Sequence, residues 1–210
     1  MAELKRKVAH YLLQSKAIIL DPANPFTWSS GWKSPIYCDN RVTLSYPEIR
    51  NFIRNAFTDI IRTEFPESEV IAGVATGAIA QGVLVADSLK LPFIYVRPSA
   101  KDHGRQNLIE GHLKPGQKVV VVEDLVSTGG SSLKAVEALR EAGAEVLGMV
   151  AIFTYGFPLA VTNFKKADLR LITLSDYPSL LSEALNTNYI AKDKLDLLEA
   201  WRTHPESWQG

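Results

Sequence analysis

Apolar side chains recur along the chain at two different spacings, which predict where helices and strands lie. They repeat at helical spacing over residues 3–14 and again over residues 45–65. Ser45 and Glu48 have the S-x-x-E spacing of a capping box, so we expect the second helix to begin there. The intervening segment 21–40 is rich in Pro, Ser, Gly and aromatic residues, which predicts turns and short strands.

The rest of the chain alternates short apolar runs with helical patterns. The runs expected to be strands are 69–74, 93–96, 118–122, 146–153 and 169–174, and the stretches expected to be helices are 77–89, 131–142, 177–185 and 192–202. Continuous apolar strands that alternate with helices predict an α/β fold with a mainly parallel sheet of about five strands, covered on both faces. We expect one domain over residues 1–210, with an N-terminal part of about 1–45 and a core sheet within about 66–175.

Composition narrows the class of protein. The 210 residues carry 23 basic and 23 acidic side chains, so no overall positive field attracts nucleic acid or an anionic membrane, and neither partner is expected. One cysteine, Cys38, cannot form an internal disulfide, and the first 20 residues lack the apolar core of a signal peptide. No stretch approaches the ~20 apolar residues of a membrane span. We therefore expect a cytoplasmic protein.

The strongest chemical signal is the segment 119–131, VVVVEDLVSTGGS. Four valines predict a buried strand, and Glu123 and Asp124 follow at its carboxyl end, where open α/β sheets bind ligands. Hydroxyl residues and two glycines then precede a helix, so backbone N–H groups and the positive end of the helix dipole are free to bind a phosphate. The two carboxylates are suited to sugar hydroxyls or to the cation of a polyphosphate. The alternative is a structural turn in which Asp124 and Ser127 only cap the helix.

This segment resembles the phosphoribosyl-diphosphate motif of type I phosphoribosyltransferases: four apolar residues, two acids, then a loop with hydroxyls at Ser127 and Ser131. It is neither a Walker A loop nor a dinucleotide fingerprint, because the required Gly-Lys-Ser/Thr and G-x-G-x-x-G patterns are missing. The turn 73–78 (GVATGA) resembles the family's diphosphate loop, in which a non-proline cis peptide is often found. Its alternative is a tight packing turn between strand and helix.

Two further segments resemble orotate phosphoribosyltransferases in particular. Residues 95–111 are similar to their mobile catalytic loop, and residues 97–118 contain five Lys/Arg and two His against two Asp/Glu, which suits a diphosphate. Residues 25–39 (PFTWSSGWKSPIYCD) are similar to the hood that covers the pyrimidine. Relatives often have a lysine at the positions of Pro98 and Ser29, and an arginine at the position of Tyr155. A solvated loop and a purely structural flap are the alternative interpretations.

The resemblance implies a type I phosphoribosyltransferase fold with an N-terminal hood, and transfer of phosphoribosyl from 5-phosphoribosyl 1-diphosphate to orotate. Lys101, His103 and Asp124 are implied as catalytic residues. Contacts to phosphoribosyl diphosphate are implied for Arg97, Lys101, His103, Glu123, Asp124, Leu125, Val126, Ser127, Thr128, Gly129, Gly130, Ser131 and Thr76. Contacts to orotate are implied for Ser127, Tyr37, Cys38 and Tyr155.

The resemblance also implies Mg²⁺, which is expected to arrive with phosphoribosyl diphosphate and for which Asp124 is the one candidate protein ligand. It implies a homodimer in which the 97–112 loop acts on the partner's site. Two other functions stay open from sequence alone. One is transfer to another base, a purine or uracil. The other is a non-catalytic regulator that senses phosphoribosyl diphosphate.

Overall fold

The computed structural model describes residues 1–28, 30–99 and 108–208. The helices are α1 (Ala2–Gln14), α2 (Pro47–Glu64), α3 (Ile79–Leu89), α4 (Gly130–Glu141), α5 (Pro158–Lys166), α6 (Tyr177–Asn186) and α7 (Leu195–Thr203), with short 3-10 helices η1 (Asn40–Ser45) and η2 (Lys192–Lys194). The main-sheet strands are β5 (Val70–Val74), β6 (Phe93–Val96), β7 (Ile109–Glu110), β8 (Lys118–Val126), β9 (Glu145–Thr154) and β10 (Leu171–Asp176). The N-terminal strands are β1 (Ile18–Leu20), β2 (Phe26–Thr27), β3 (Lys33–Ser34) and β4 (Ile36–Cys38).

The central sheet has the order β10-β9-β8-β5-β6-β7. Its first five strands are parallel, as the sequence predicts, and the sixth, β7, runs antiparallel to β6. The sequence prediction missed β7 because two residues inside a polar segment give no periodicity. The parallel strands end together at one edge of the sheet, which brings the residues after β5 and β8 close to each other.

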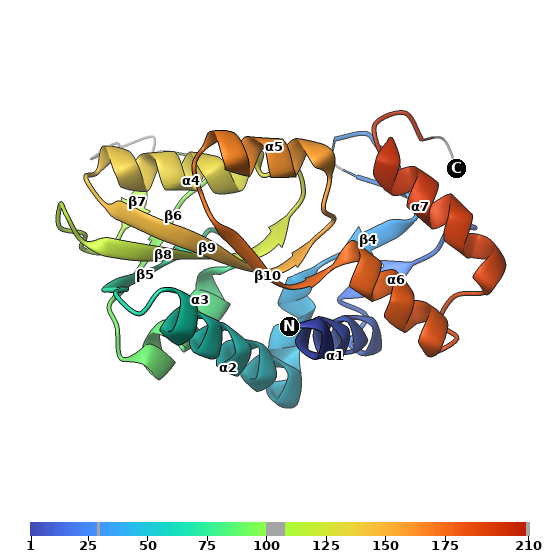
Figure 1. Cartoon of the computed structure of the whole chain (residues 1–210), viewed down its shortest axis with the longest axis horizontal. Coiled ribbons are helices and arrows are strands. Elements are labelled where there is room, and N and C mark those ends of the chain that lie inside the picture. Colours follow the sequence, from blue (N-terminus) through green and yellow to red (C-terminus); the bar gives the residue numbers. More distant parts are fainter. Residues whose placement is uncertain (29, 100–107, 209–210) are drawn as a thin grey trace.

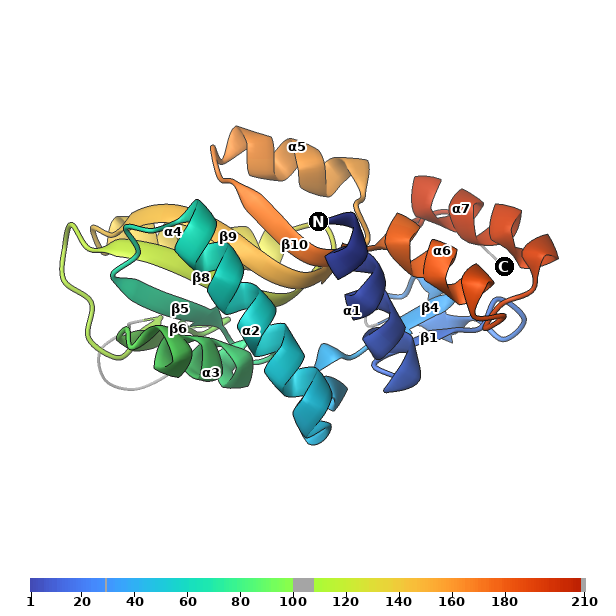
Figure 2. The same cartoon turned by 60° about the horizontal axis from the view of Figure 1, so that its bottom comes forward.

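Helices cover the sheet on both faces (Figure 1). α4 and α5 lie on one face, and α1, α2 and α3 lie on the other, as the turned view also shows (Figure 2). Alternate valines of β8 serve the two faces: Val119 and Val121 belong to the core under α4 and α5, whereas Val120 and Val122 belong to the core under the N-terminal helices. This confirms the expectation of a strand buried on both sides.

The N-terminal hood consists of two small antiparallel pairs, β1 with β4 and β2 with β3. Trp28 connects the pairs, because its indole nitrogen donates to the carbonyl of Ile36 at 3.1 Å. α6 and α7 lie at the same end of the molecule as the hood (Figure 1). None of the helices in the described part of the chain is long and apolar enough to span a membrane.

One local expectation is wrong, and one helix was not anticipated. The capping box at Ser45 is not used, since α2 begins after Tyr46 without a side-chain cap and Glu48 instead accepts from the Tyr11 hydroxyl at 3.1 Å. The sequence analysis made no prediction for residues 158–166, where α5 begins with Pro158. A nine-residue helix gives too few repeats to reveal its period.

Candidate active site

The acidic pair lies within β8 rather than after it, because the strand continues to Val126. The alternation along a strand sends the two side chains in opposite directions. Glu123 points inward and is 4% exposed, whereas Asp124 is half-buried and lines an open cavity of about 320 Å³. The two carboxylates therefore have different surroundings, although they are neighbours in sequence.

Glu123 holds the local backbone in place. Its carboxylate accepts from the Ser132 hydroxyl at 2.8 Å and from the backbone N–H of Asp124 at 2.9 Å. Burial, together with the nearby carboxylate of Asp124, raises the pKa of Glu123 well above its ordinary value. A carboxyl group held in this way positions Asp124.

The walls of the small cavity are the end of β8 with the loop that follows it and the turn after β5. Its lining consists of Val74, Ala75, Thr76, Gly77, Glu123, Asp124, Leu125, Ser127, Thr128, Gly129, Gly130 and Ser131. Gly129 has φ +83° and begins α4, so this loop leads directly into a helix N-terminus, as predicted. A cis peptide joins Ala75 to Thr76.

Val126 is the one member of the predicted loop 123–131 that does not line this cavity. Its side chain is 0% exposed and packs in the core, and its carbonyl accepts from the Thr154 hydroxyl at 2.9 Å. The prediction treated 123–131 as one continuous binding loop. The strand in fact continues to Val126, whose side chain packs in the core beneath α4 and α5 instead of facing the cavity.

Gly77 was absent from the predicted contacts, yet it is pressed against Asp124. A Cβ at position 77 would meet the carboxyl atoms of Asp124 at 2.2–2.6 Å. A glycine is therefore the residue that lets this carboxylate approach the turn after β5. The signal in the sequence was the glycine itself, inside a segment already assigned to a diphosphate.

A second cavity, of about 590 Å³, lies beside the first, and four of its ten lining residues are aromatic, so it is called the aromatic cavity. Its lining consists of Thr27, Trp28, Ser30, Trp32, Tyr37, Cys38, Leu125, Ser127, Thr128 and Tyr155. Leu125, Ser127 and Thr128 line both cavities, so a ligand can pass from one into the other along this part of the loop. All four residues predicted to contact the base line this second cavity.

Tyr155 forms the back of the aromatic cavity and is 2% exposed. Its ring lies 5.2 Å from those of Trp28 and Phe157 and 5.6 Å from that of Trp201 in α7. Burial raises the pKa of its hydroxyl well above the ordinary value, so it stays protonated. Sequence reasoning missed Trp201, because nothing local to α7 indicates that its indole supports a cavity built from residues far earlier in the chain.

Cys38 and Tyr37 form the opposite wall from β4. Tyr37 is 44% exposed, whereas Cys38 is half-buried and its thiol donates to the Asn40 side chain at 3.5 Å. Burial and the nearby Asp124 carboxylate raise the pKa of this thiol well above its ordinary value. A protonated, half-buried thiol is a wall of the cavity and not a nucleophile.

Arg97 lines neither cavity, and its guanidinium lies 3.6 Å from the Glu110 carboxylate. Lys101, His103 and Ser29 lie outside the described residues. Among the described residues, no cluster of three or more His, Cys, Asp or Glu could hold a metal ion. Among the described residues, the carboxylates that line the small cavity are those of Glu123 and Asp124. Glu123 is already hydrogen-bonded by Ser132, so Asp124 is the carboxylate available to a ligand.

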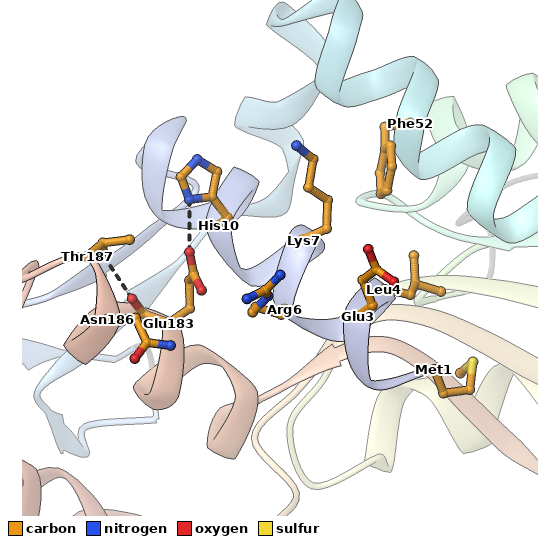
Figure 3. A pocket seen from close by; sticks show the side chains of 10 residues that line it. All are labelled: Met1, Glu3, Leu4, Arg6, Lys7, His10, Phe52, Glu183, Asn186 and Thr187. Carbon is orange, nitrogen blue, oxygen red and sulfur yellow. Dashed lines mark hydrogen bonds and ion pairs between the residues drawn. The ribbon is translucent and has the colours of Figure 1, made fainter.

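A larger cavity, of about 970 Å³, lies elsewhere, between α1, α2 and α6 (Figure 3). One face of α1 lines it, and His10 lies 3.0 Å from the Glu183 carboxylate across it. It contains none of the motif residues. Size alone therefore does not identify the functional site; the convergence of a phosphate-binding loop, a carboxylate and an aromatic wall does.

Comparisons with known proteins agree with this geometry. The phosphoribosyl transferase domain family matches residues 44–171. The chain is 60% identical to an orotate phosphoribosyltransferase of Porphyromonas gingivalis, over 99% of both chains, and 53% identical to one of Lactococcus lactis, over 98% of this chain and 99% of that one. The structure is similar to that of an orotate phosphoribosyltransferase from Aeropyrum pernix, with a TM-score of 0.75 and 27% identity over 88% of this chain and 99% of that one. The chain therefore belongs to the orotate phosphoribosyltransferase family.

Proposed function

We propose that this protein transfers the phosphoribosyl group from 5-phosphoribosyl 1-diphosphate to orotate, which gives orotidine 5′-phosphate and diphosphate in pyrimidine biosynthesis. One observation carries the proposal: a phosphate-binding cavity and an aromatic cavity share Leu125, Ser127 and Thr128, and Asp124 lines the first of them beside this shared segment. The product contains one phosphate, one ribose and one flat base. The joined cavities offer a surface for each part in that order.

On the donor side, the N–H groups of residues 127–131 and the N-terminus of α4 bind the 5′-phosphate. Asp124 contacts the ribose hydroxyls and stabilises the positive charge that develops on the ring as the anomeric C–O bond breaks. The turn at Thr76 and Gly77 approaches the leaving diphosphate. Glu123 also lines this cavity, where the resemblance implies a contact to the donor, and its carboxylate holds the backbone N–H of Asp124.

On the acceptor side, orotate lies in the aromatic cavity between the hood and Tyr155. Trp28 and Tyr155 supply apolar ring surface, and Ser127 and the backbone at Tyr37 and Cys38 supply hydrogen-bonding groups. Orotate is an anion that is already nucleophilic at its ring nitrogen, so no general base is assigned. The site has to position the nitrogen and exclude water.

Mg²⁺ fits this site as a companion of the diphosphate. Mg²⁺ prefers oxygen ligands and is commonly held by one or two carboxylates together with substrate phosphates. Asp124 offers such a carboxylate in the small cavity. When bound, the ion would neutralise charge on the leaving diphosphate.

The protein is proposed to act in the cytoplasm as a homodimer in which Arg97, Lys101 and His103 of one subunit act on the partner's donor site. Lys101→Ala and Asp124→Ala each inactivate their own homodimer, but a mixed dimer has one site with both lesions and one with neither. If half the dimers are mixed, an equal mixture recovers about a quarter of wild-type activity. No recovery despite proven subunit exchange would show that each site uses one chain.

The direct test follows orotate absorbance with phosphoribosyl diphosphate and Mg²⁺. Orotate should be consumed, whereas adenine, hypoxanthine and uracil in parallel reactions should not. Turnover of one of those bases instead would assign the protein to another acceptor. Tight binding of phosphoribosyl diphosphate without turnover of any base would support the alternative function, a non-catalytic regulator that senses phosphoribosyl diphosphate.

A further inference from the structure

Asn40 connects the two cavities, although it lines neither. It is the first residue of η1 and follows β4, the hood strand that carries Tyr37 and Cys38. Asn40 is buried, with 2% of its surface exposed. A buried amide needs hydrogen-bond partners, and those partners show what it holds together.

Both ends of the Asn40 amide are used. Its Nδ2 donates to the backbone carbonyl of Asp124 at 2.7 Å, across 84 positions of sequence. Its Oδ1 accepts from the Cys38 thiol at 3.5 Å. One side chain thus contacts the residue at the base wall and the backbone of the residue at the ribose.

These contacts permit one orientation of the amide. A flipped amide would place Oδ1 against the carbonyl of Asp124 and leave two buried acceptors facing each other. Glu123 holds the backbone N–H of Asp124 from the other side, at 2.9 Å. The peptide groups on both sides of the Asp124 side chain are therefore fixed, one by a residue of the core and one by a residue of the hood.

The thiol extends the connection into the base cavity, because Cys38 lines it together with Tyr155. A base that presses on the hood strand would displace Cys38, and Cys38 would displace the Asn40 amide. Asn40 would then move the carbonyl of Asp124. No other hydrogen bond from the hood strands or η1 to the acidic pair is found among the described residues.

We propose that Asn40 is a positioning residue that couples occupation of the base cavity to placement of the Asp124 carboxylate at the ribose. This inference rests on the proposed function and adds to it a structural reason why binding at the base site changes the affinity of the donor site. Coupling of this kind is reciprocal: a bound ribose phosphate raises the affinity for orotate by the same factor by which orotate raises the affinity for ribose phosphate.

The test measures that factor with a pair that cannot react. Ribose 5-phosphate has no leaving group, so calorimetric titration of orotate with and without saturating ribose 5-phosphate gives the coupling directly. In the wild type, ribose 5-phosphate should tighten orotate binding about fivefold or more. In Asn40→Ala, which removes both amide hydrogen bonds without adding a charge, the factor should fall to about one while each ligand alone binds within about twofold of wild type.

Thr43→Val is the matched control. Thr43 is buried in the same 3-10 helix and donates to the backbone carbonyl of Asn40 at 2.6 Å, so its loss weakens the element without touching the amide. This variant should melt at a lower temperature but keep the wild-type coupling factor. If Asn40→Ala does not fold, Asn40→Asp serves in its place, with the coupling factor alone as the readout, because its added charge changes the affinity for each anionic ligand.

Three results overturn the role of Asn40: no coupling in the wild type, an unchanged factor in the folded Asn40 variant, or an equal loss of coupling in Thr43→Val. Wild-type turnover measured in the same preparations separates this from failure of the proposed function. Absent wild-type turnover contradicts the function, whereas normal turnover with unchanged coupling in the variant contradicts only the role of Asn40.

Discussion

The small cavity, proposed to bind the donor, and the aromatic cavity, proposed to bind the base, are built in opposite ways; they are called the donor cavity and the base cavity below. The donor cavity takes its lining from two short segments, 74–77 and 123–131 without Val126, and its binding groups are backbone amides, hydroxyls and the carboxylate of Asp124. The base cavity takes its lining from the hood, from the loop after β8 and from Tyr155 at the end of β9, with Trp201 of α7 packed behind. The first depends on local backbone geometry, and the second depends on packing between distant segments.

The largest expected effect tests the dependence of the base cavity on remote packing. Trp201 is 0% exposed and its ring lies within 5.6 Å of those of Trp28, Tyr155, Phe157 and Tyr177. Trp201→Ala should lower the free energy of unfolding by about 3–5 kcal/mol, since it leaves a large cavity in the core. It should also raise KM for orotate more than KM for phosphoribosyl diphosphate.

Urea unfolding and steady-state kinetics measure these two effects. Trp208→Ala is the control, because Trp208 is only partly buried and packs at the margin of the same core. It should cost clearly less stability. Equal increases in both KM values for Trp201→Ala would show that the two cavities do not depend on different parts of the fold.

The second prediction concerns the carboxylate of Asp124. Asp124→Asn keeps the shape of the side chain but removes its charge, so it should lower kcat by about tenfold or more if the carboxylate stabilises positive charge on the ribose. Circular dichroism and the melting temperature should stay close to wild type. Wild-type kcat in the folded variant would remove Asp124 from the mechanism.

The third prediction tests whether the donor cavity tolerates one added carbon. Gly77→Ala would place a Cβ 2.2–2.6 Å from the carboxyl atoms of Asp124, so the carboxylate has to move. We expect kcat to fall by up to about tenfold, less than for Asp124→Asn, because the charge remains. The penalty should shrink when the same substitution is made in an Asp124→Gly background. An undiminished penalty in that background would mean that position 77 acts without Asp124.

The smallest expected effect is a change in the pH dependence of stability, which concerns Glu123 and not Asp124. The pKa of Glu123 is raised by burial, so the native state binds a proton that the unfolded state releases, and the resulting stability is lost as pH rises through the native pKa. Glu123→Gln has no such proton. Relative to wild type it should gain stability as the pH rises from the ordinary glutamate pKa of 4.5 through the neutral range. Thermal melts over this range measure the difference, and parallel curves for the two proteins would contradict it.

Sequence reasoning succeeds where function is local. Four valines, two acids and a glycine-containing loop follow one another in the chain, so the sequence alone locates the donor cavity and the parallel sheet that carries it. It could not assign different roles to Glu123 and Asp124 before the extent of β8 was known, because the strand continues through both and turns them to opposite sides.

Sequence reasoning fails where the site depends on contacts between distant segments. Asn40 and Asp124 are 84 positions apart, and Trp201 reaches Tyr155 from a helix near the C-terminus. No periodicity or motif marks such pairs, because each residue is ordinary in its own local sequence. The same holds for β7, which exists only by pairing with β6.

One measurement tests most directly the claim that the two cavities form a single site. In a crystal structure of the protein with orotidine 5′-phosphate, the phosphate should contact the amides of residues 127–131, the ribose hydroxyls should contact Asp124, and the pyrimidine should lie between Trp28, Tyr37 and Tyr155. A phosphate bound in the aromatic cavity, or the nucleotide bound in the groove between α1 and α6, would contradict the account.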